Sequence, residues 1–259
     1  MTNLVRVEKE NQLAIVTIDN PPLNVISRQV FQGLSEVFTQ LKDDNEIVAV
    51  LITGSGDMAF AAGADIKEFP QMMGNPNMKE TVRESHGVLT QIDQFPKPTI
   101  AVLNGMTLGG GCELALACDL RVAEVGVEIG LPEVKLGLFP GAGGTQRLSR
   151  LVGNAKAKEM IFTGDPLSAQ EAERIGLVNK VVDEGSALNE SKKLASRITR
   201  HSLQALSRIK KAIDEGSEST LEQGLELETN LFEEIFQTED VKEGVAAFLE
   251  KRKPAFSHR

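Results

Sequence analysis

The chain has 259 residues, of which 41% are hydrophobic and 25% are charged, the ordinary composition of a soluble globular protein. Its net charge of -9 disfavours a general nucleic-acid-binding protein, because no overall positive field would attract phosphates, but it leaves open a local basic patch for a phosphorylated small ligand. No apolar run approaches the roughly 18 residues of a membrane helix, and residues 1–18 are typical of an alternating strand, not of a signal peptide.

The cysteines and histidines indicate neither a disulfide framework nor a metal site. Cys112 and Cys118 would lie about 9 Å apart along one helix, which is too far for a disulfide. His86, His201 and His258 are scattered along the chain. We therefore expect a cytoplasmic protein with reduced thiols and without a bound metal.

Strand and helix patterns alternate over roughly the first half of the chain. Residues 13–18 and 47–54 are short β-branched runs typical of strands, and the apolar spacing within 27–44 is helical, with Ser27 as a plausible N-cap. This order predicts a buried parallel strand pair with a right-handed crossover. The pattern then recurs, with a helix predicted over 82–95, a strand over 98–105, a helix over 113–119 and a strand over 120–124. The fold class is therefore α/β.

The second half of the chain is predicted to be mainly helical. Residues 141–182 are interpreted as short helices broken by glycines, and from about Glu190 onward nearly every segment has a helical pattern. We accordingly divide the chain into a core, residues 1–195, and a helical C-terminal region, residues 196–259.

Glycines in three segments could present backbone N–H groups to a ligand: residues 59–69, 104–120 and 131–148. The first two follow predicted strands, where a turn of small residues can direct N–H groups at a ligand oxygen. Two such turns side by side would form an oxyanion hole. Each turn alone is also compatible with a purely structural role for its glycines. The "GAGGTQ" stretch lacks the spacing of a nucleotide-triphosphatase phosphate loop.

Two acidic residues stand within these segments. Glu113 follows three glycines and Cys112 at the start of an apolar run, and Glu133 follows Pro132. Either residue could be an ordinary acid at a helix end or turn, where the helix dipole favours it. Since an unpaired buried carboxylate is costly, two acids beside backbone donors are also the set suited to proton transfer next to a carbonyl.

In this order and at these separations, the three segments resemble the crotonase superfamily, and specifically its enoyl-CoA hydratases. The stretches that carry the resemblance are FAAGADIKEF, NGMTLGGGCELALACDLRVA and LPEVKLGLFPGAGGTQRL, and the tail GVAAFLEKRKPAF is similar to the closing motif of the family. The resemblance runs nearly end to end. It implies a spiral core of repeated ββα units, followed by a helical C-terminal region that builds a trimer, often a dimer of trimers.

The resemblance also implies roles for individual residues. Ala64 and Gly110 match the two oxyanion-hole N–H donors, and Glu113 and Glu133 match the two catalytic glutamates. Seven further positions match substrate-binding residues of the family: Ala62, Asp65, Ile66, Lys67, Gly141, Phe248 and Lys251.

Three of the substrate-binding positions have more specific counterparts. Gly141 matches a glycine at the start of a helix whose N–H faces the reacting centre, and Phe248 and Lys251 match tail residues that reach the CoA of a neighbouring subunit. The sequence alone leaves open that Lys251, with Arg252 and Lys253, is a solvated basic tail.

The function implied by the resemblance is reversible addition of water to a trans-2-enoyl-CoA, giving a 3-hydroxyacyl-CoA in fatty acid or branched-chain acyl breakdown. In it, Glu113 takes a proton from the attacking water and Glu133 supplies the proton for Cα. CoA is part of the substrate and not a cofactor. The expected partners are an acyl-CoA and further copies of the chain, without nucleic acid or membrane. A methylglutaconyl-CoA-type hydratase, an enoyl-CoA isomerase and a non-catalytic CoA-binding subunit remain alternatives.

Overall fold

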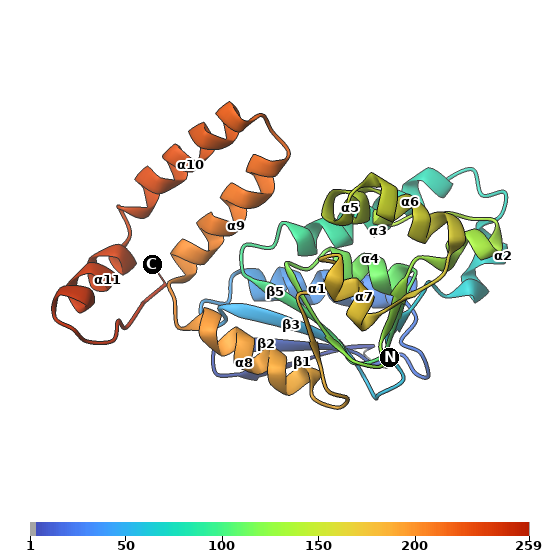
Figure 1. Ribbon diagram of the computed structural model, residues 1–259, viewed down its shortest axis with the longest axis horizontal. Coiled ribbons are helices and arrows are strands. Elements are labelled where there is room, and N and C mark those ends of the chain that lie inside the picture. Colours follow the sequence, from blue (N-terminus) through green and yellow to red (C-terminus); the bar gives the residue numbers. More distant parts are fainter. Residues whose placement is uncertain (1–3, 259) are drawn as a thin grey trace.

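Two sheets of mainly parallel strands form the centre of the computed structural model, which describes residues 4–258 except for the side chains of Lys67 and Gln71 (Figure 1). The larger sheet has the order β1 (Val5–Glu10), β2 (Leu13–Ile18), β3 (Ala49–Gly54), β5 (Thr99–Leu103), β7 (Leu120–Glu124) and β10 (Lys180–Val182). The smaller sheet has the order β4 (Ala59–Ala62), β6 (Met106–Leu108), β8 (Glu128–Gly130) and β9 (Leu167–Ser168). The β1–β2 and β8–β9 pairs are antiparallel, and the other pairs are parallel.

The chain repeats one ββα unit, in which the first strand joins the larger sheet, the second joins the smaller sheet and a helix follows. The units are β3–β4 with α3 (Met78–Asp93), β5–β6 with α4 (Gly110–Leu116) and β7–β8 with α5 (Gly144–Val152). Short helices intervene in two of them, namely η1 (Ile66–Glu68), α2 (Phe69–Met72) and η2 (Pro132–Leu136). This repeat confirms the predicted α/β fold class and the ββα units that the resemblance implied.

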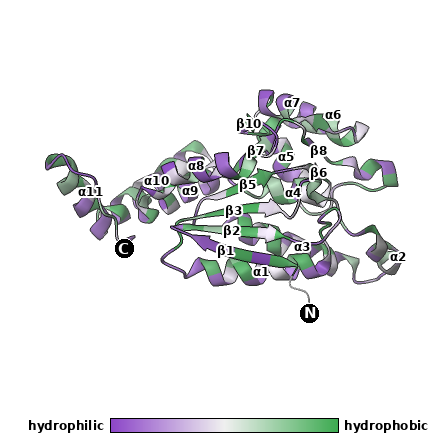
Figure 2. Cartoon of the chain, turned by 90° about the horizontal axis from the view of Figure 1, so that it is seen from below, coloured by the Kyte–Doolittle hydropathy of each residue, from purple (hydrophilic) through white to green (hydrophobic). Residues whose placement is uncertain are grey.

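Strand β3 is buried on both faces, as expected for a central parallel strand. Because side chains alternate along a strand, Val50 and Ile52 join the apolar cluster that includes Phe38 of α1 (Arg28–Lys42). Leu51 joins the opposite cluster, with Ala195 of α8 (Ala187–Thr199). Strands β2 and β3 are mainly green or pale in Figure 2, whereas β1 at the edge and the outer helices mix green and purple.

The first predicted strand–helix–strand unit is confirmed. Residues of β2 and β3 pair in parallel register, and α1 joins them. The side chain of Ser27 caps α1 by accepting a hydrogen bond from the Val30 amide at 3.3 Å.

The prediction of only short helices over 141–182 is wrong at its end. Helices α6 (Asn154–Thr163) and α7 (Ala169–Arg174) are present, but β9 and β10 lie in the same region. Strand β10 has three residues, and it forms because it pairs in parallel with β7. A period-2 pattern cannot be recognised in so short a segment.

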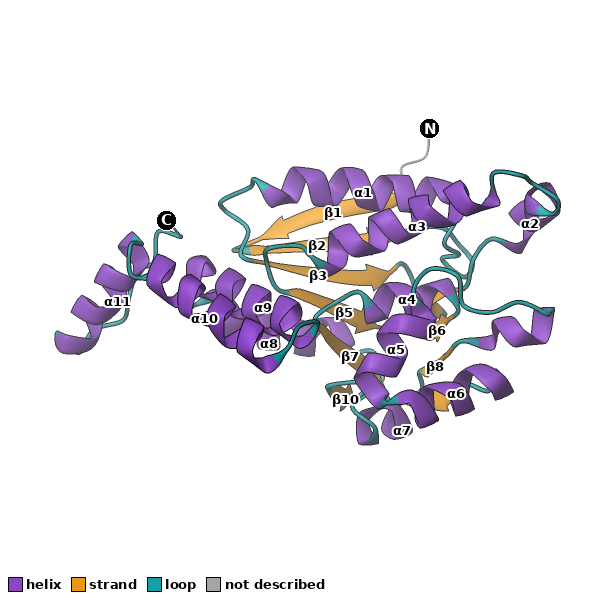
Figure 3. Cartoon of the chain, turned by 90° about the horizontal axis from the view of Figure 1, so that it is seen from above, coloured by secondary structure: helices purple, strands orange, loops and turns teal. Residues whose placement is uncertain are grey.

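Three C-terminal helices project from the core in Figures 1 and 3, and we call residues 203–258 the arm. The arm helices are α9 (Leu203–Ser217), α10 (Leu221–Ile235) and α11 (Glu239–Leu249). Lys210 of α9 attaches the arm to the core through an ion pair with Asp119 at 2.7 Å. The boundary predicted between residues 195 and 196 falls inside α8, which packs on the larger sheet. No helix in the described part of the chain is long and apolar enough to cross a membrane.

The two ends of the arm meet at its base. The Leu203 amide donates to His258 Nδ1 at 3.1 Å, and Gln204 donates to the His258 carbonyl at 2.8 Å. The buried carboxylate of Asp240 accepts from the amides of Ser257 and His258, at 2.8 and 3.0 Å. The C-terminal segment therefore returns to the point where the arm leaves the core.

Candidate active site

A buried carboxylate lies at the start of α4, immediately after the glycine turn. Glu113 is only 3% exposed, and its Oε1 accepts hydrogen bonds from the Ala142 and Gly144 amides at 2.7 and 2.8 Å. Gly144 is the first residue of α5, so the carboxylate also occupies the positive end of that helix. Both of these hydrogen bonds use Oε1, and none within the described residues is made to Glu113 Oε2.

Two glycines of the turn are required by geometry. Gly109 has φ of 54°, a left-handed conformation that side chains disfavour. A Cβ on Gly111 would lie 1.9 Å from the Ala61 carbonyl oxygen, so only glycine lets α4 pack this closely against β4. The glycines are therefore needed for the backbone conformation at Gly109 and for the close packing at Gly111. This packing of α4 on β4 positions Glu113, which lies two residues after Gly111.

The environment of Glu113 acts in two directions on its pKa. Burial raises the pKa because it disfavours the charged form, whereas the Gly144 and Ala142 amides lower it. The charges of His86 and Arg147 also lower it, and the net result is a raised pKa. Glu113 therefore binds a proton more readily than an exposed glutamate does, while two N–H donors fix the position of its carboxyl group.

Glu133 faces the same turn from η2. A Cβ on Gly109 would lie 3.2 Å from Glu133 Oε1, so this carboxyl group rests against the turn that begins α4. Its Oε2 is buried, and within the described residues no group donates a hydrogen bond to it. Burial, with a further contribution from the charge of Glu113, raises the pKa of Glu133 to about 7. The structure thus brings the two predicted acids together around one turn.

The amides of Ala64 and Gly110 also lie side by side. A Cβ on Gly110 would be 3.7 Å from the Ala64 nitrogen. The Ile26 amide donates to the Gly63 carbonyl at 2.8 Å and fixes the backbone there. As the first residue of α4, Gly110 has an N–H without an intrahelical acceptor. This proximity is compatible with an oxyanion hole, and the role itself stays a prediction.

The other residues of the first glycine segment border this site. Ala62 ends β4, and Asp65 and Ile66 follow Ala64 into η1, where Ile66 is 58% exposed. The side chain of Lys67 lies outside the described residues. These positions are compatible with contacts to a bound ligand, and their assignment to a CoA pocket stays a prediction.

Gly141 was predicted to lie at the start of a helix, and this prediction is wrong. The helix begins three residues later, at Gly144, because Gly143 adopts a left-handed conformation with φ of 105° and forms the N-cap. The amides that face Glu113 are those of Ala142 and Gly144. The carbonyl oxygen of Gly141 instead accepts a hydrogen bond from His86 at 2.7 Å.

Phe248 and Lys251 do not lie at the site of their own chain. Both are at the end of α11 on the arm, which Figure 1 shows apart from α4, and Phe248 is 83% exposed. Lys251 has φ of 56°, and its amide donates to the Phe248 carbonyl. Their contact with a neighbouring subunit stays a prediction.

Sequence reasoning missed the residues that hold Glu113. The Ala142 and Gly144 amides carry no side-chain signal, and only the glycine-rich stretch around them indicated exposed backbone donors. His86 and Arg147 had no signal at all, since a His or Arg on a helix surface is ordinary. Among the described residues, no cluster of three or more His, Cys, Asp or Glu side chains could hold a metal ion.

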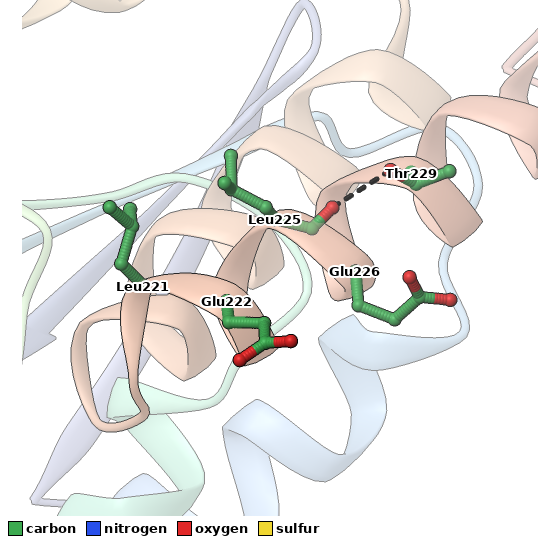
Figure 4. Close-up of a pocket in the computed structure, with 5 residues that line it drawn as sticks. All are labelled: Leu221, Glu222, Leu225, Glu226 and Thr229. Atoms are coloured by element: carbon green, nitrogen blue, oxygen red, sulfur yellow. Dashed lines mark hydrogen bonds between the residues drawn. The ribbon is translucent and has the colours of Figure 1, made fainter.

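A shallow pocket lies on the arm, separate from the glutamate pair. Figure 4 shows its lining residues, all from α10: Leu221, Glu222, Leu225, Glu226 and Thr229. Because a single helix supplies every lining residue, the pocket is a depression on an outer helix face. It has none of the convergent donors found around Glu113.

Comparison with known proteins identifies close relatives along the whole chain. A family model described as enoyl-CoA hydratase/isomerase matches residues 8–259. The short-chain-enoyl-CoA hydratase of Clostridium acetobutylicum is 42% identical over 252 residues, covering 97% of this chain and 96% of the relative. The crotonyl-CoA hydratase of Syntrophomonas wolfei is 43% identical over 251 residues, covering 96% of each chain.

Solved structures agree with the sequence relatives. The crystal structure of enoyl-CoA hydratase from Bacillus anthracis is similar with a TM-score of 0.94 and 36% identity, covering 99% of this chain and 100% of that chain. Pseudomonas aeruginosa DspI is similar with a TM-score of 0.93 and 40% identity, covering 98% and 97% of the two chains. The likeness includes the arm as well as the core.

Proposed function

The chain belongs to the enoyl-CoA hydratase/isomerase family, and we propose that it adds water reversibly to a trans-2-enoyl-CoA to give a 3-hydroxyacyl-CoA. One observation carries the proposal: two carboxyl groups with raised pKa values, Glu113 and Glu133, face one turn beside the Ala64 and Gly110 amides. Hydration needs one group to take a proton from water and another to deliver a proton to carbon, and this pair can do both.

The proposed reaction begins with a water molecule at the free oxygen of Glu113. Glu113 takes a proton as the water oxygen attacks Cβ of the substrate, and the electron pair of the C=C bond moves toward the thioester. Glu133 delivers its proton to Cα, which completes the 3-hydroxyacyl product. Proton exchange between the two carboxyl groups and solvent restores the starting state.

The two carboxyl groups suit these roles because their surroundings differ. Glu113 keeps two backbone donors on Oε1, which favour its ionised form as a base. Glu133 has a buried Oε2 without a donor and a pKa of about 7, so a large fraction carries a proton at neutral pH. When the surroundings of two carboxyl groups give them different pKa values, one can act as the acid and the other as the base.

Negative charge develops on the thioester oxygen as the water attacks. The N–H groups of Ala64 and Gly110 are proposed to receive that oxygen. Loss of one such donor typically costs about 3 to 4 kcal/mol of transition-state stabilisation. The contact is made by backbone atoms, so the fold supplies it without a dedicated side chain.

The CoA moiety is proposed to enter as part of the substrate, with Ala62, Asp65, Ile66 and Lys67 along its path. No separate cofactor is required by the chemistry above. The names of the two relatives, short-chain-enoyl-CoA hydratase and crotonyl-CoA hydratase, support a short acyl chain as the first substrate to test.

We also propose that the protein associates through its arm into a trimer or a dimer of trimers. The arm carries large apolar side chains that its own chain leaves exposed: Ile209, Ile213, Leu221, Leu225, Phe232, Phe236, Val245, Phe248 and Leu249. Such a set on projecting helices is more than a monomer usually leaves in contact with water.

The test is a panel of enoyl-CoA substrates followed by loss of enoyl-thioester absorbance. Crotonyl-, hexenoyl-, decenoyl- and methylcrotonyl-CoA are compared, and the product is identified by mass as substrate plus water. Turnover of crotonyl-CoA is expected. Absence of hydration on all four would overturn the proposal, and conversion of a 3-enoyl-CoA to its 2-enoyl isomer without hydration would favour the isomerase alternative.

A further inference from the structure

One peptide group links a surface histidine to the buried carboxylate. The peptide bond between Gly141 and Ala142 presents its carbonyl oxygen to His86 Nε2 at 2.7 Å and its N–H to Glu113 Oε1 at 2.7 Å. In a trans peptide these two groups point in opposite directions from a rigid plane. The rotation of this plane therefore decides whether both bonds are made.

This peptide group lies in a segment without regular structure. Residues 137–143 connect η2 to α5, and Leu138, Phe139 and Gly141 are exposed. Gly141 has no side chain to pack, and a Cβ there would meet no atom closer than 4.0 Å. Pro140 and Ala142, on either side of Gly141, are buried, so packing fixes the flanks of the segment, and hydrogen bonds at Gly141 and Ala142 set the orientation of the peptide plane between them.

Helix α3 holds the segment at two points. His86 binds the Gly141 carbonyl, and Asp93, two turns further along the helix, binds Arg147 Nε and Nη2 at 3.2 and 3.1 Å. Arg147 Nη1 in turn donates to the Ala142 carbonyl at 3.4 Å. The Asp93–Arg147 contact restrains the peptide that follows Ala142, whereas His86 binds the carbonyl of the peptide whose N–H reaches Glu113.

We propose that His86 is a positioning residue for Glu113, which it orients through the Gly141–Ala142 peptide group. The inference rests on the proposed function, in which Glu113 is the base. A carbonyl can only accept, so the His86 Nε2 carries a hydrogen in this contact. Both the neutral ring with a proton on Nε2 and the charged ring satisfy this requirement.

His86 acts on Glu113 through charge as well. The charges that act on Glu113 are those of His86 on α3 and Arg147 on α5, and the charge of Glu113 in turn raises the pKa of Glu133 on η2. His86 and Arg147 lower the pKa of Glu113 against the larger effect of burial. Loss of His86 removes one of the two opposing charges, so the pKa of Glu113 rises and a higher pH is needed to ionise the base.

The experiment separates the hydrogen bond from the charge. His86→Leu removes both, and His86→Gln keeps an N–H donor but not the charge. His201→Leu is the matched control, because it makes the same change at an exposed histidine before α9. All are compared with the wild type for kcat and KM on crotonyl-CoA from pH 5 to 9, with melting temperature as a check of folding.

His86→Leu is expected to lower kcat roughly 10- to 100-fold, the range that misplacement of a catalytic group produces. Its KM should change less than about twofold. The acidic limb of its kcat profile should move to higher pH. His86→Gln should recover most of kcat while keeping part of the pH shift, and His201→Leu should match the wild type.

Three outcomes would overturn the inference while the wild type remains active. They are an unchanged kcat and pH profile in His86→Leu, an equal loss of kcat in His86→Gln, and a raised KM at constant kcat, which would make His86 a substrate contact. A wild type that hydrates no enoyl-CoA would instead overturn the proposed function, and this inference with it.

Discussion

Glu113 and Glu133 face one turn, yet they differ in what holds them. Two amides anchor Glu113, whereas Glu133 has a buried oxygen without a donor. Replacement of either residue by Gln keeps size and removes proton transfer. Both variants should therefore lower kcat by roughly 10²- to 10⁴-fold, with KM changed only slightly. Steady-state kinetics on crotonyl-CoA are the measurement, and a near-native rate in either variant would make that glutamate a structural acid.

The raised pKa of Glu133 has a consequence for stability. Because burial raises this pKa to about 7 in the folded protein, the group stabilises the fold at low pH, and this contribution is lost as pH rises through 7. Glu133→Gln does not ionise. The melting temperature of the variant, relative to the wild type, should therefore increase between pH 6 and pH 8.5. If the difference in melting temperature between the variant and the wild type stayed constant across this range, burial would not raise the pKa of Glu133.

At the residue scale, the sequence predicted the acids better than their partners. Glu113 and Glu133 stand in motifs that resemble a known family, so their positions could be assigned. Ala142 and Gly144 act through backbone amides, and the N-cap at Gly143 moved the start of the helix beyond Gly141. Which amide points at a carboxylate depends on such local dihedral angles, and these are not encoded in residue type.

At the scale of single elements, α4 can pack against β4 only because residue 111 is glycine. A Cβ there would lie 1.9 Å from the Ala61 oxygen, and backbone cannot yield without moving the strand. Gly111→Ala should cost about 1 to 3 kcal/mol or more of unfolding free energy, as overpacking does.

The control for Gly111→Ala is Gly87→Ala within α3, where a Cβ meets no atom within 4 Å. It should stabilise the protein by about 0.5 to 1 kcal/mol, because Ala is the better helix former. Urea midpoints at an unchanged slope measure both effects. Equal midpoints for the two variants would contradict the packing argument.

The end of α11 carries the prediction for Lys251. If Lys251 meets the phosphates of CoA on a neighbouring subunit, Lys251→Ala should raise KM and leave kcat nearly unchanged. The effect should weaken at high salt, since exposed charges are screened, and it should vanish for an enoyl-pantetheine, which lacks the adenosine phosphates. If the wild type and Lys251→Ala had equal KM values at low salt, Lys251 would be part of a solvated basic tail without contact to CoA.

Long elements with a clear hydrophobic periodicity could be predicted from the sequence, whereas the shortest strands could not. The pattern over 27–44 predicted α1 and its Ser27 cap, and the alternation of apolar runs predicted the parallel pairing of β2 with β3. Strands β4, β6 and β8 have only three or four residues each, so their periodicity cannot be read. They exist because each ββα turn stacks on the previous one, which is a property of the assembled fold.

For the whole molecule, the exposed arm predicts self-association. Phe232 is 64% exposed and packs edge-to-face on Phe236, with ring centroids 5.2 Å apart. Phe232→Asp places a charge on this surface and should shift the protein toward smaller assemblies. Light scattering at micromolar concentration measures the mass, and Asn230→Asp adds the same charge at an exposed polar position as a control. A monomeric wild type would contradict the prediction.

The closure of the arm at its base makes it a separable module. The chain leaves the core at Ser202, and His258 returns to within a hydrogen bond of Leu203, so residues 203–258 form an excursion with adjacent ends. Segments with adjacent ends can be exchanged with little disturbance to the scaffold that carries them. An arm with a different exposed surface is therefore expected to fold on this core. The catalytic frame and the assembly state would then be free to diverge independently during evolution.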